Sequence, residues 1–132
     1  MLFRSFVPHV LPVLVCSTVE FPNEDDFYHN VFSVVAGNRF DLGRYPKGES
    51  TRQKFTKPAL VVVRCEIHPS MKAFILVLKS PYFSSPDEQG RFTIPNVPAG
   101  KYTIKAWHPA RAEQIRIITV PESGEVQADF TF

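Results

Sequence analysis

Short runs of β-branched and aromatic residues, separated by Pro, Gly, Ser and Asn, set the strongest limit on how this chain can fold. Such runs are typical of β-strands that end in turns. They lie at residues 17–23, 29–35, 59–65, 72–79, 90–94, 101–107 and 114–120. No stretch of helical length repeats its apolar residues at three and four positions. The sequence therefore predicts an all-β fold, either a sandwich or a barrel.

The domain organisation follows from length and from one linker candidate. The chain has 132 residues, which is long enough for one packed domain and short for two. The segment 80–90 is rich in Ser and Pro and divides residues 1–80 from residues 81–132. The second part is small for an independent core. We expect it to pack on the first part or to belong to a sandwich whose other strands lie outside this chain.

Charge and composition argue against several classes of function. The net charge is +2, and the Lys and Arg residues are scattered, so nucleic acid is not an expected partner. No apolar run is long enough to cross a bilayer. The opening residues resemble an export signal faintly, but prolines and His9 interrupt the apolar stretch, so we interpret them as structure. A hydrolase is the weakest option, because no nucleophile, phosphate-loop or His-Glu motif is present.

One loop joins three residues that bind soft metals. In RCEIHPSMKAF, Cys65, His68 and Met71 follow one another at intervals of three residues. Thiolate with imidazole selects copper, zinc or iron, and two His with one Cys and a weak axial Met is the ligand set of blue-copper electron transfer. The second imidazole is expected from His29, because the strand that begins there can lie beside the strand that ends at Cys65.

This pattern resembles the cupredoxins. HNV followed after about 36 residues by CEIHPSM is similar to their ligand pattern, and Cys-x-x-His-Pro-x-Met is most similar to amicyanin-like loops. The lead-in FVPHVLPVLVCSTVEFPNEDDFYHNVFS adds to the resemblance, which covers roughly residues 6–79. It implies a cupredoxin-like Greek-key β-sandwich with additional C-terminal strands.

The resemblance also implies a role for each residue. His29, Cys65 and His68 would be the equatorial ligands of one type 1 copper ion, and Met71 the axial ligand. Asn30 would tie the two ligand segments together by hydrogen bonds. His68 would lie nearest solvent, with Pro69 in the docking face for a redox protein partner. A periplasmic or otherwise exported location follows from the resemblance alone. An electron carrier performs no bond chemistry on a substrate, so the chain is not expected to be an enzyme.

Two features depart from the cupredoxin pattern. Cys16 stands where a Gly is usual, and more than 50 residues follow the strand after Met71. That tail contains GRFTIPNVPAGKYTI and is similar to carboxypeptidase-regulatory-like (transthyretin-like) segments. Chains that combine both parts resemble exported bacterial proteins described as methylamine-utilisation-like or plastocyanin-like. Cys16 and Cys65 could instead form a disulfide, which would remove the thiol from the metal loop.

Other candidate residues have simpler interpretations. We expect His9 and His108 to be structural, Cys16 to be a small buried hydrophobe, and the acidic residues 24–26 to form a solvated turn. Three functions remain open. They are an electron carrier, a copper-binding or copper-resistance protein without redox turnover, and a structural β-sandwich interaction module. In the last case, exposed strand edges could pair two chains into a homodimer.

Overall fold

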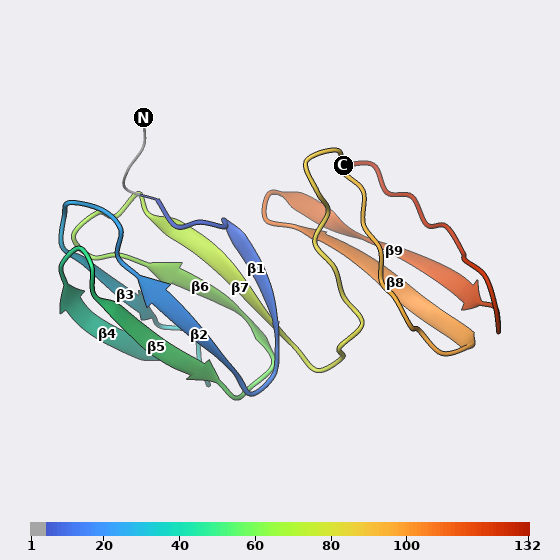
Figure 1. Cartoon of the computed structure of the whole chain (residues 1–132), viewed down its shortest axis with the longest axis horizontal. Helices are drawn as coiled ribbons and strands as arrows, with labels where there is room; N and C mark the ends of the chain where they lie inside the picture. The colour runs from blue at the N-terminus through green and yellow to red at the C-terminus, as the bar shows by residue number, and fades with distance from the viewer. Residues whose placement is uncertain (1–4) are drawn as a thin grey trace. The chain divides into compact units, whose positions relative to one another are not determined.

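The structure, a computed structural model, describes residues 5–132 and divides into two compact units between Phe83 and Ser84. This division falls inside the Ser- and Pro-rich segment 80–90. Every regular element of the described residues is a β-strand (Figure 1), as the sequence pattern predicts. Across residues 5–132 there is no helix with the length and apolarity needed to span a bilayer.

The first unit contains seven strands in two sheets. Five strands form one sheet in the order β1-β7-β6-β3-β4, in which β1 runs parallel to β7 and the other neighbours are antiparallel. Strands β2 and β5 form the second sheet. The strands are β1 (Val10–Leu14), β2 (Ser17–Pro22), β3 (His29–Ser33), β4 (Phe40–Tyr45), β5 (Ser50–Phe55), β6 (Ala59–Arg64) and β7 (Lys72–Leu78).

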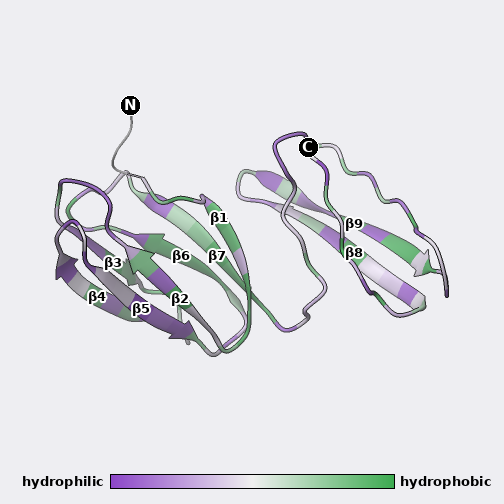
Figure 2. Ribbon diagram, viewed as in Figure 1, coloured by the Kyte–Doolittle hydropathy of each residue, from purple (hydrophilic) through white to green (hydrophobic). Residues whose placement is uncertain are grey.

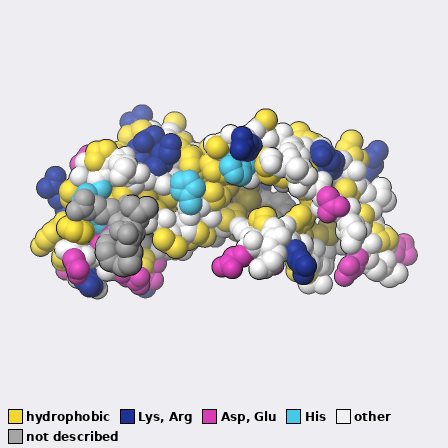
Figure 3. Space-filling model, turned by 90° about the horizontal axis from the view of Figure 1, so that it is seen from above, with side chains coloured by type: hydrophobic (Ala, Val, Ile, Leu, Met, Phe, Trp, Pro, Cys, Tyr) yellow, Lys and Arg dark blue, Asp and Glu magenta, His cyan; other side chains and the backbone are white. Residues whose placement is uncertain are grey.

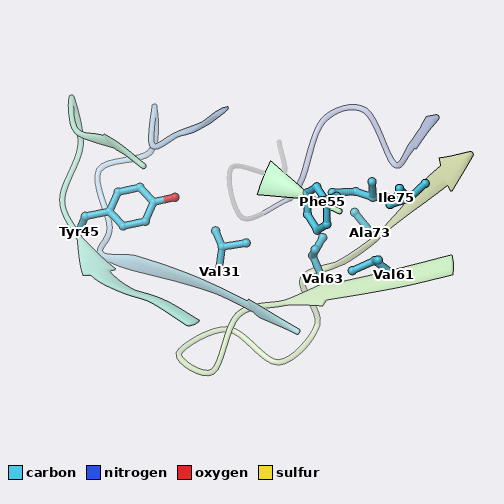
Figure 4. Packing of buried hydrophobic residues seen from close by; sticks show 8 residues of the cluster. Val31, Tyr45, Phe55, Val61, Val63, Ala73 and Ile75 are labelled. Carbon is cyan, nitrogen blue, oxygen red and sulfur yellow. The ribbon is translucent and has the colours of Figure 1, made fainter. Parts of the chain in front are cut away.

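The hydrophobic core of this unit lies between the two sheets. Along β7 every second side chain is buried, as the two-residue period of a strand requires, and β6 follows the same pattern. The second sheet contributes Phe55, which is fully buried and faces Val63 and Ile75 of the first sheet (Figure 4). Strands β1, β6 and β7 are correspondingly the most apolar of the unit (Figure 2). Unit 1 is therefore a β-sandwich.

Strands β4 and β5 are absent from the sequence prediction because neither contains a run of β-branched and aromatic residues, and β5 is mostly polar (Figure 2). In β5, Arg52 and Lys54 are exposed, and only Phe55 at the end of the strand is fully buried. The strand forms because β2 pairs with it along its whole length. Such a strand lacks the apolar run that identifies β6 in the sequence.

The predicted strand at residues 90–94 is wrong. Gly90 has a φ of +79° and its backbone N–H donates to the carbonyl of Asp87, so the chain turns here. The Asp87 carboxylate accepts from the backbone N–H groups of Gln89 and Arg91, which closes the turn further. Pro95 follows, and it has no N–H for a sheet ladder. The β-branched and aromatic residues of this run thus lie in an irregular segment.

The second unit contains one antiparallel hairpin, β8 (Gly100–His108) with β9 (Arg111–Val120). Aromatic residues of the irregular segments before and after it pack together, Phe92 with Phe130 at 6.4 Å between ring centres. Ile115 and Ile117 of β9 remain more than half exposed. Both acidic and basic side chains lie on the face of this unit that is drawn in Figure 3. The homodimer expected from strand edges stays a prediction.

Replacing Phe55 with Ala tests the sandwich core. Phe55 has no exposed surface, and its ring centre lies 5.6 Å from that of Phe40, so Phe55→Ala leaves a cavity between the sheets. We expect the free energy of unfolding of the metal-free protein, measured in urea, to fall by about 3–5 kcal/mol. Lys54→Ala, on the exposed side of the same strand, should change stability by less than about 0.5 kcal/mol. Equal losses for both variants would contradict this packing.

Candidate metal centre

The pairing of β3 with β6 brings two distant parts of the chain together. The strands are antiparallel and Phe32 pairs with Arg64, so the start of β3 lies beside the residues that follow β6. His29 is the first residue of β3, and Cys65 comes directly after β6. Both side chains are buried, with exposed fractions of 5% and 1%. Strand pairing therefore places an imidazole next to a thiol, as the sequence analysis expects.

Three donor atoms converge at this point. Sγ of Cys65 lies 3.7 Å from Nδ1 of His29 and 4.0 Å from Nδ1 of His68. The two Nδ1 atoms are 3.0 Å apart. His29, Cys65 and His68 also form the only group of three His, Cys or acidic ligand atoms this close together within residues 5–132. Both cysteines are free thiols, so no disulfide takes Cys65 out of the cluster.

The size of this triangle suits a metal ion. The circle through the three donor atoms has a radius of about 2.1 Å, close to the bond lengths of zinc to imidazole nitrogen, about 2.0–2.1 Å, and to thiolate sulfur, about 2.3 Å. Two ring nitrogens 3.0 Å apart repel each other if both present lone pairs. Either a proton on one nitrogen or a cation between them is needed to stabilise the contact. The donor atoms are thus already spaced for coordination.

The other ring nitrogen of His29 fixes which tautomer is present. Nε2 of His29 lies 2.7 Å from Oδ2 of Asp25. An ionised carboxylate only accepts hydrogen bonds, so the ring proton is on Nε2. In the neutral imidazole this leaves a lone pair on Nδ1, the atom that faces Cys65 and His68. Metal-ligating histidines are commonly oriented by a carboxylate in this way.

Asn30 connects the strand of His29 to the loop of Cys65. Its side chain is 2% exposed, and Oδ1 accepts a hydrogen bond from the backbone N–H of Glu66 at 2.9 Å. The same oxygen accepts from Sγ of Cys65 at 3.4 Å. These contacts agree with the linking role that the resemblance implies for Asn30.

Met71 ends the loop. Its backbone N–H donates to the carbonyl of His68 at 2.9 Å, which closes a turn, and its side chain is 4% exposed. A thioether buried directly after the turn of His68 suits the fourth position of the ligand set. Its axial role stays a prediction.

On its outer side the cluster contacts an aromatic ring. His68 is half-buried and its ring packs edge-to-face against Phe27, with ring centres 5.9 Å apart. Phe27, Tyr28 and Pro69 are exposed. His68 is therefore the member of the cluster closest to the surface, and the exposed ring of Phe27 contacts it.

Sequence reasoning missed Asn23 and Asp25 and misjudged Cys16. The sequence predicts a solvated turn at residues 24–26, yet the Asp25 side chain is only 19% exposed and contacts His29. The spacing of four residues between Asp25 and His29 is the only signal that the sequence contains. Cys16 is exposed, contrary to the expectation of a buried residue. Its φ of 70° explains why Gly is usual at this turn.

His9 and His108 have the structural surroundings that the sequence analysis expects. The ring of His9 packs edge-to-face on Phe74 at 5.4 Å. Nδ1 of His108 accepts from the backbone N–H of Ala110, and its ring packs on Phe132. Neither residue belongs to the cluster of donor atoms.

Solved structures show what the first unit resembles. A Cu-containing nitrite reductase from Thermus scotoductus SA-01 is 37% identical over 58% of this chain, with a TM-score of 0.54. The matched part is 20% of that protein, so the chain spans about a fifth of it. The reduced Cu(I) form of an amicyanin mutant is 25% identical over 56% of this chain and 73% of that one, with a TM-score of 0.51. A second amicyanin mutant, in its oxidised form, is 22% identical over 57% of this chain and 74% of its own, with a TM-score of 0.53.

The first unit has the cupredoxin fold. With two imidazoles, one thiol and a nearby thioether, its residues fit a single type 1 copper ion.

The tail has a different relative. Residues 79–128 match the family described as Polysaccharide lyase family 4, domain II. The resemblance to carboxypeptidase-regulatory-like segments and to methylamine-utilisation-like proteins stays a prediction. No curated protein matches the chain.

Asn30 can be tested through stability. Asn30→Ala removes the acceptor for the backbone N–H of Glu66. We expect the free energy of unfolding of the metal-free protein, measured in urea, to fall by about 1–3 kcal/mol. Ser50→Ala removes an exposed hydrogen bond to Glu20 and should cost less than about 0.5 kcal/mol. If Asn30→Ala costs no more than Ser50→Ala, Asn30 does not tie the two segments together.

Tyr45 should make stability depend on pH. It pairs with His29 in the ladder of β3 and β4, and its hydroxyl donates to the carbonyl of Phe21 at 2.8 Å. Burial, and then the negative charge of Cys65, raise the pKa of Tyr45 from 10.0 to about 12. The native protein thus keeps this proton more tightly than the unfolded chain does. The stabilisation is complete below pH 10 and is lost as pH rises toward 12.

The free energy of unfolding, measured in urea at several pH values, should fall more steeply between pH 10 and 12 for the wild type than for Tyr45→Phe. Tyr28→Phe, which removes an exposed hydroxyl, serves as the control and should keep the wild-type slope. A wild-type slope in Tyr45→Phe would show that the buried hydroxyl is not responsible.

Proposed function

We propose that the first unit is a type 1 (blue) copper protein that carries single electrons between protein partners and catalyses no reaction itself. The observation that supports this most directly is the convergence of one thiol and two imidazole nitrogens within a triangle of metal-binding size. The similarity to a copper-containing nitrite reductase and to a Cu(I) form of amicyanin agrees with it.

When bound, the copper ion supplies the chemistry by alternating between Cu(I) and Cu(II). The chain supplies rigidity, because His29 lies on a strand and Cys65 is fastened to that strand through Asn30. Ligands whose positions are set by packing and hydrogen bonds keep nearly the same geometry in both oxidation states. Little reorganisation then accompanies the gain or loss of an electron.

Partner recognition would take place around His68. This residue lies closest to the surface, the exposed ring of Phe27 packs against it, and the exposed Pro69 follows it in the chain. One electron would enter from a reduced redox protein and leave to an oxidised one at this face. An exported, periplasmic setting, which the family resemblance implies, is part of the same proposal. The reaction of the nitrite reductase is not assigned to this chain, which matches only a fifth of that enzyme.

The thiol of Cys65 gives the direct test. One equivalent of Cu(II) should give the purified protein a strong visible absorption from the thiolate and a type 1 paramagnetic resonance spectrum. Cys65→Ser should lose this colour completely, because a hydroxyl cannot replace the thiolate in charge transfer to copper. Cys16→Ser removes the other, exposed thiol and should keep the colour. A colourless copper-loaded wild type would rule out the proposal.

A second measurement separates a carrier from a protein that only holds copper. A carrier should have a reversible midpoint potential and fast electron self-exchange. Slow or irreversible reduction of a blue protein would favour copper storage or resistance. Absence of stoichiometric copper binding would favour a structural interaction module.

A further inference from the structure

We propose that Asp25 is a positioning residue for the copper centre, which orients His29 and favours Cu(II) over Cu(I). This inference rests on the proposed function of the first unit and adds a residue to it. Asp25 contacts the donor triangle through His29, by the hydrogen bond to Nε2. Asp25 therefore affects the copper affinity and the midpoint potential of the site, and the set of ligands stays the same.

The position of Asp25 is determined by a buried residue. Oδ1 of Asn23, which is 5% exposed, accepts from the backbone N–H of Asp25 at 2.9 Å. Nδ2 of Asn23 donates to the carbonyls of Phe27, at 2.8 Å, and Tyr45, at 3.0 Å. The turn between β2 and β3 is thus folded around one amide, which links it to β4. This arrangement fixes the Asp25 backbone so that its carboxylate meets the ring nitrogen of His29 that does not face Cys65.

Charge gives the direction of the effect. The Asp25 carboxylate is 19% exposed and the His29 side chain 7%, so solvent and salt screen their interaction only in part. A negative charge on the far side of an imidazole makes the ring a stronger donor at Nδ1. It also stabilises the ion with the higher positive charge more, since Coulomb energy is proportional to charge. Removing the carboxylate should therefore weaken Cu(II) binding more than Cu(I) binding.

The neighbouring Asp26 offers a matched control. Its carboxylate is 81% exposed and pairs with Nζ of Lys47 at 2.8 Å. Asp26→Asn removes the same charge from the same turn without touching His29. An effect of net charge alone would appear in both variants, whereas an effect through His29 requires Asp25.

The experiment compares the wild type, Asp25→Asn and Asp26→Asn as full chains loaded with copper. We expect Asp25→Asn to bind Cu(II) about 10–100-fold more weakly, the usual effect of removing such a partner. For each factor of ten by which the affinity for Cu(II) falls more than the affinity for Cu(I), the midpoint potential rises by about 59 mV. Asp26→Asn should change neither quantity by more than about twofold, as expected for an exposed pair. Equal midpoint potentials for the two variants would overturn the inference.

Two further measurements keep the result decisive. If circular dichroism melts show that Asp25→Asn folds poorly, Asp25→Ala replaces it. This second variant should shift the midpoint potential in the same direction. In the wild type loaded with Cu(I), nitrogen NMR should show the His29 proton on Nε2, in slow exchange with water. A proton on Nδ1, or none on Nε2, would also overturn the inference. A wild type without blue colour would instead refute the proposed function itself.

Discussion

The contact between β3 and β6 is the interaction on which the metal centre depends. Pairing of Phe32 with Arg64 brings His29, at the start of β3, next to Cys65, which follows β6 and lies 36 residues later in sequence. Asn30 then completes this link where the ladder ends, by accepting from the backbone of Glu66 and the thiol of Cys65. Because the Asn30 and Cys65 side chains are buried, each lost hydrogen bond would leave a polar atom without compensation from water.

The cluster is asymmetric in a way that suits electron transfer. On the inner side, His29 and Cys65 are buried. His29 is fixed by a hydrogen bond to Asp25, and Cys65 by a hydrogen bond to Asn30. On the outer side, His68 is half-buried and packs against the exposed ring of Phe27. If the chain carries electrons as proposed, the rigid interior would limit rearrangement on oxidation, and the half-buried His68 would shorten the path to a partner.

The sequence predicted much of this arrangement because its signals are local. Strands β6 and β7 are apolar enough to be recognised alone, and the Cys-x-x-His-x-x-Met spacing indicates a soft metal. Strand β5 carries no such signal, since its pairing with β2, rather than its composition, makes it a strand. For residues 90–94 the error is the reverse, because a strand is predicted where none forms. Its β propensity is high, but the turn at Gly90 leaves it irregular.

The sequence by itself determined the chemistry available, namely one thiol, two imidazoles and a thioether, and the all-β class that could bring them together. Only the tertiary structure decided that His29 meets Cys65 through Nδ1, that Cys16 stays apart from it, and that Asp25 turns inward while Asp26 pairs with Lys47. Residue types and spacing are written along the chain. Distances between segments depend instead on strand register and on buried hydrogen bonds, such as those of Asn23 and Asn30, which exist only after folding.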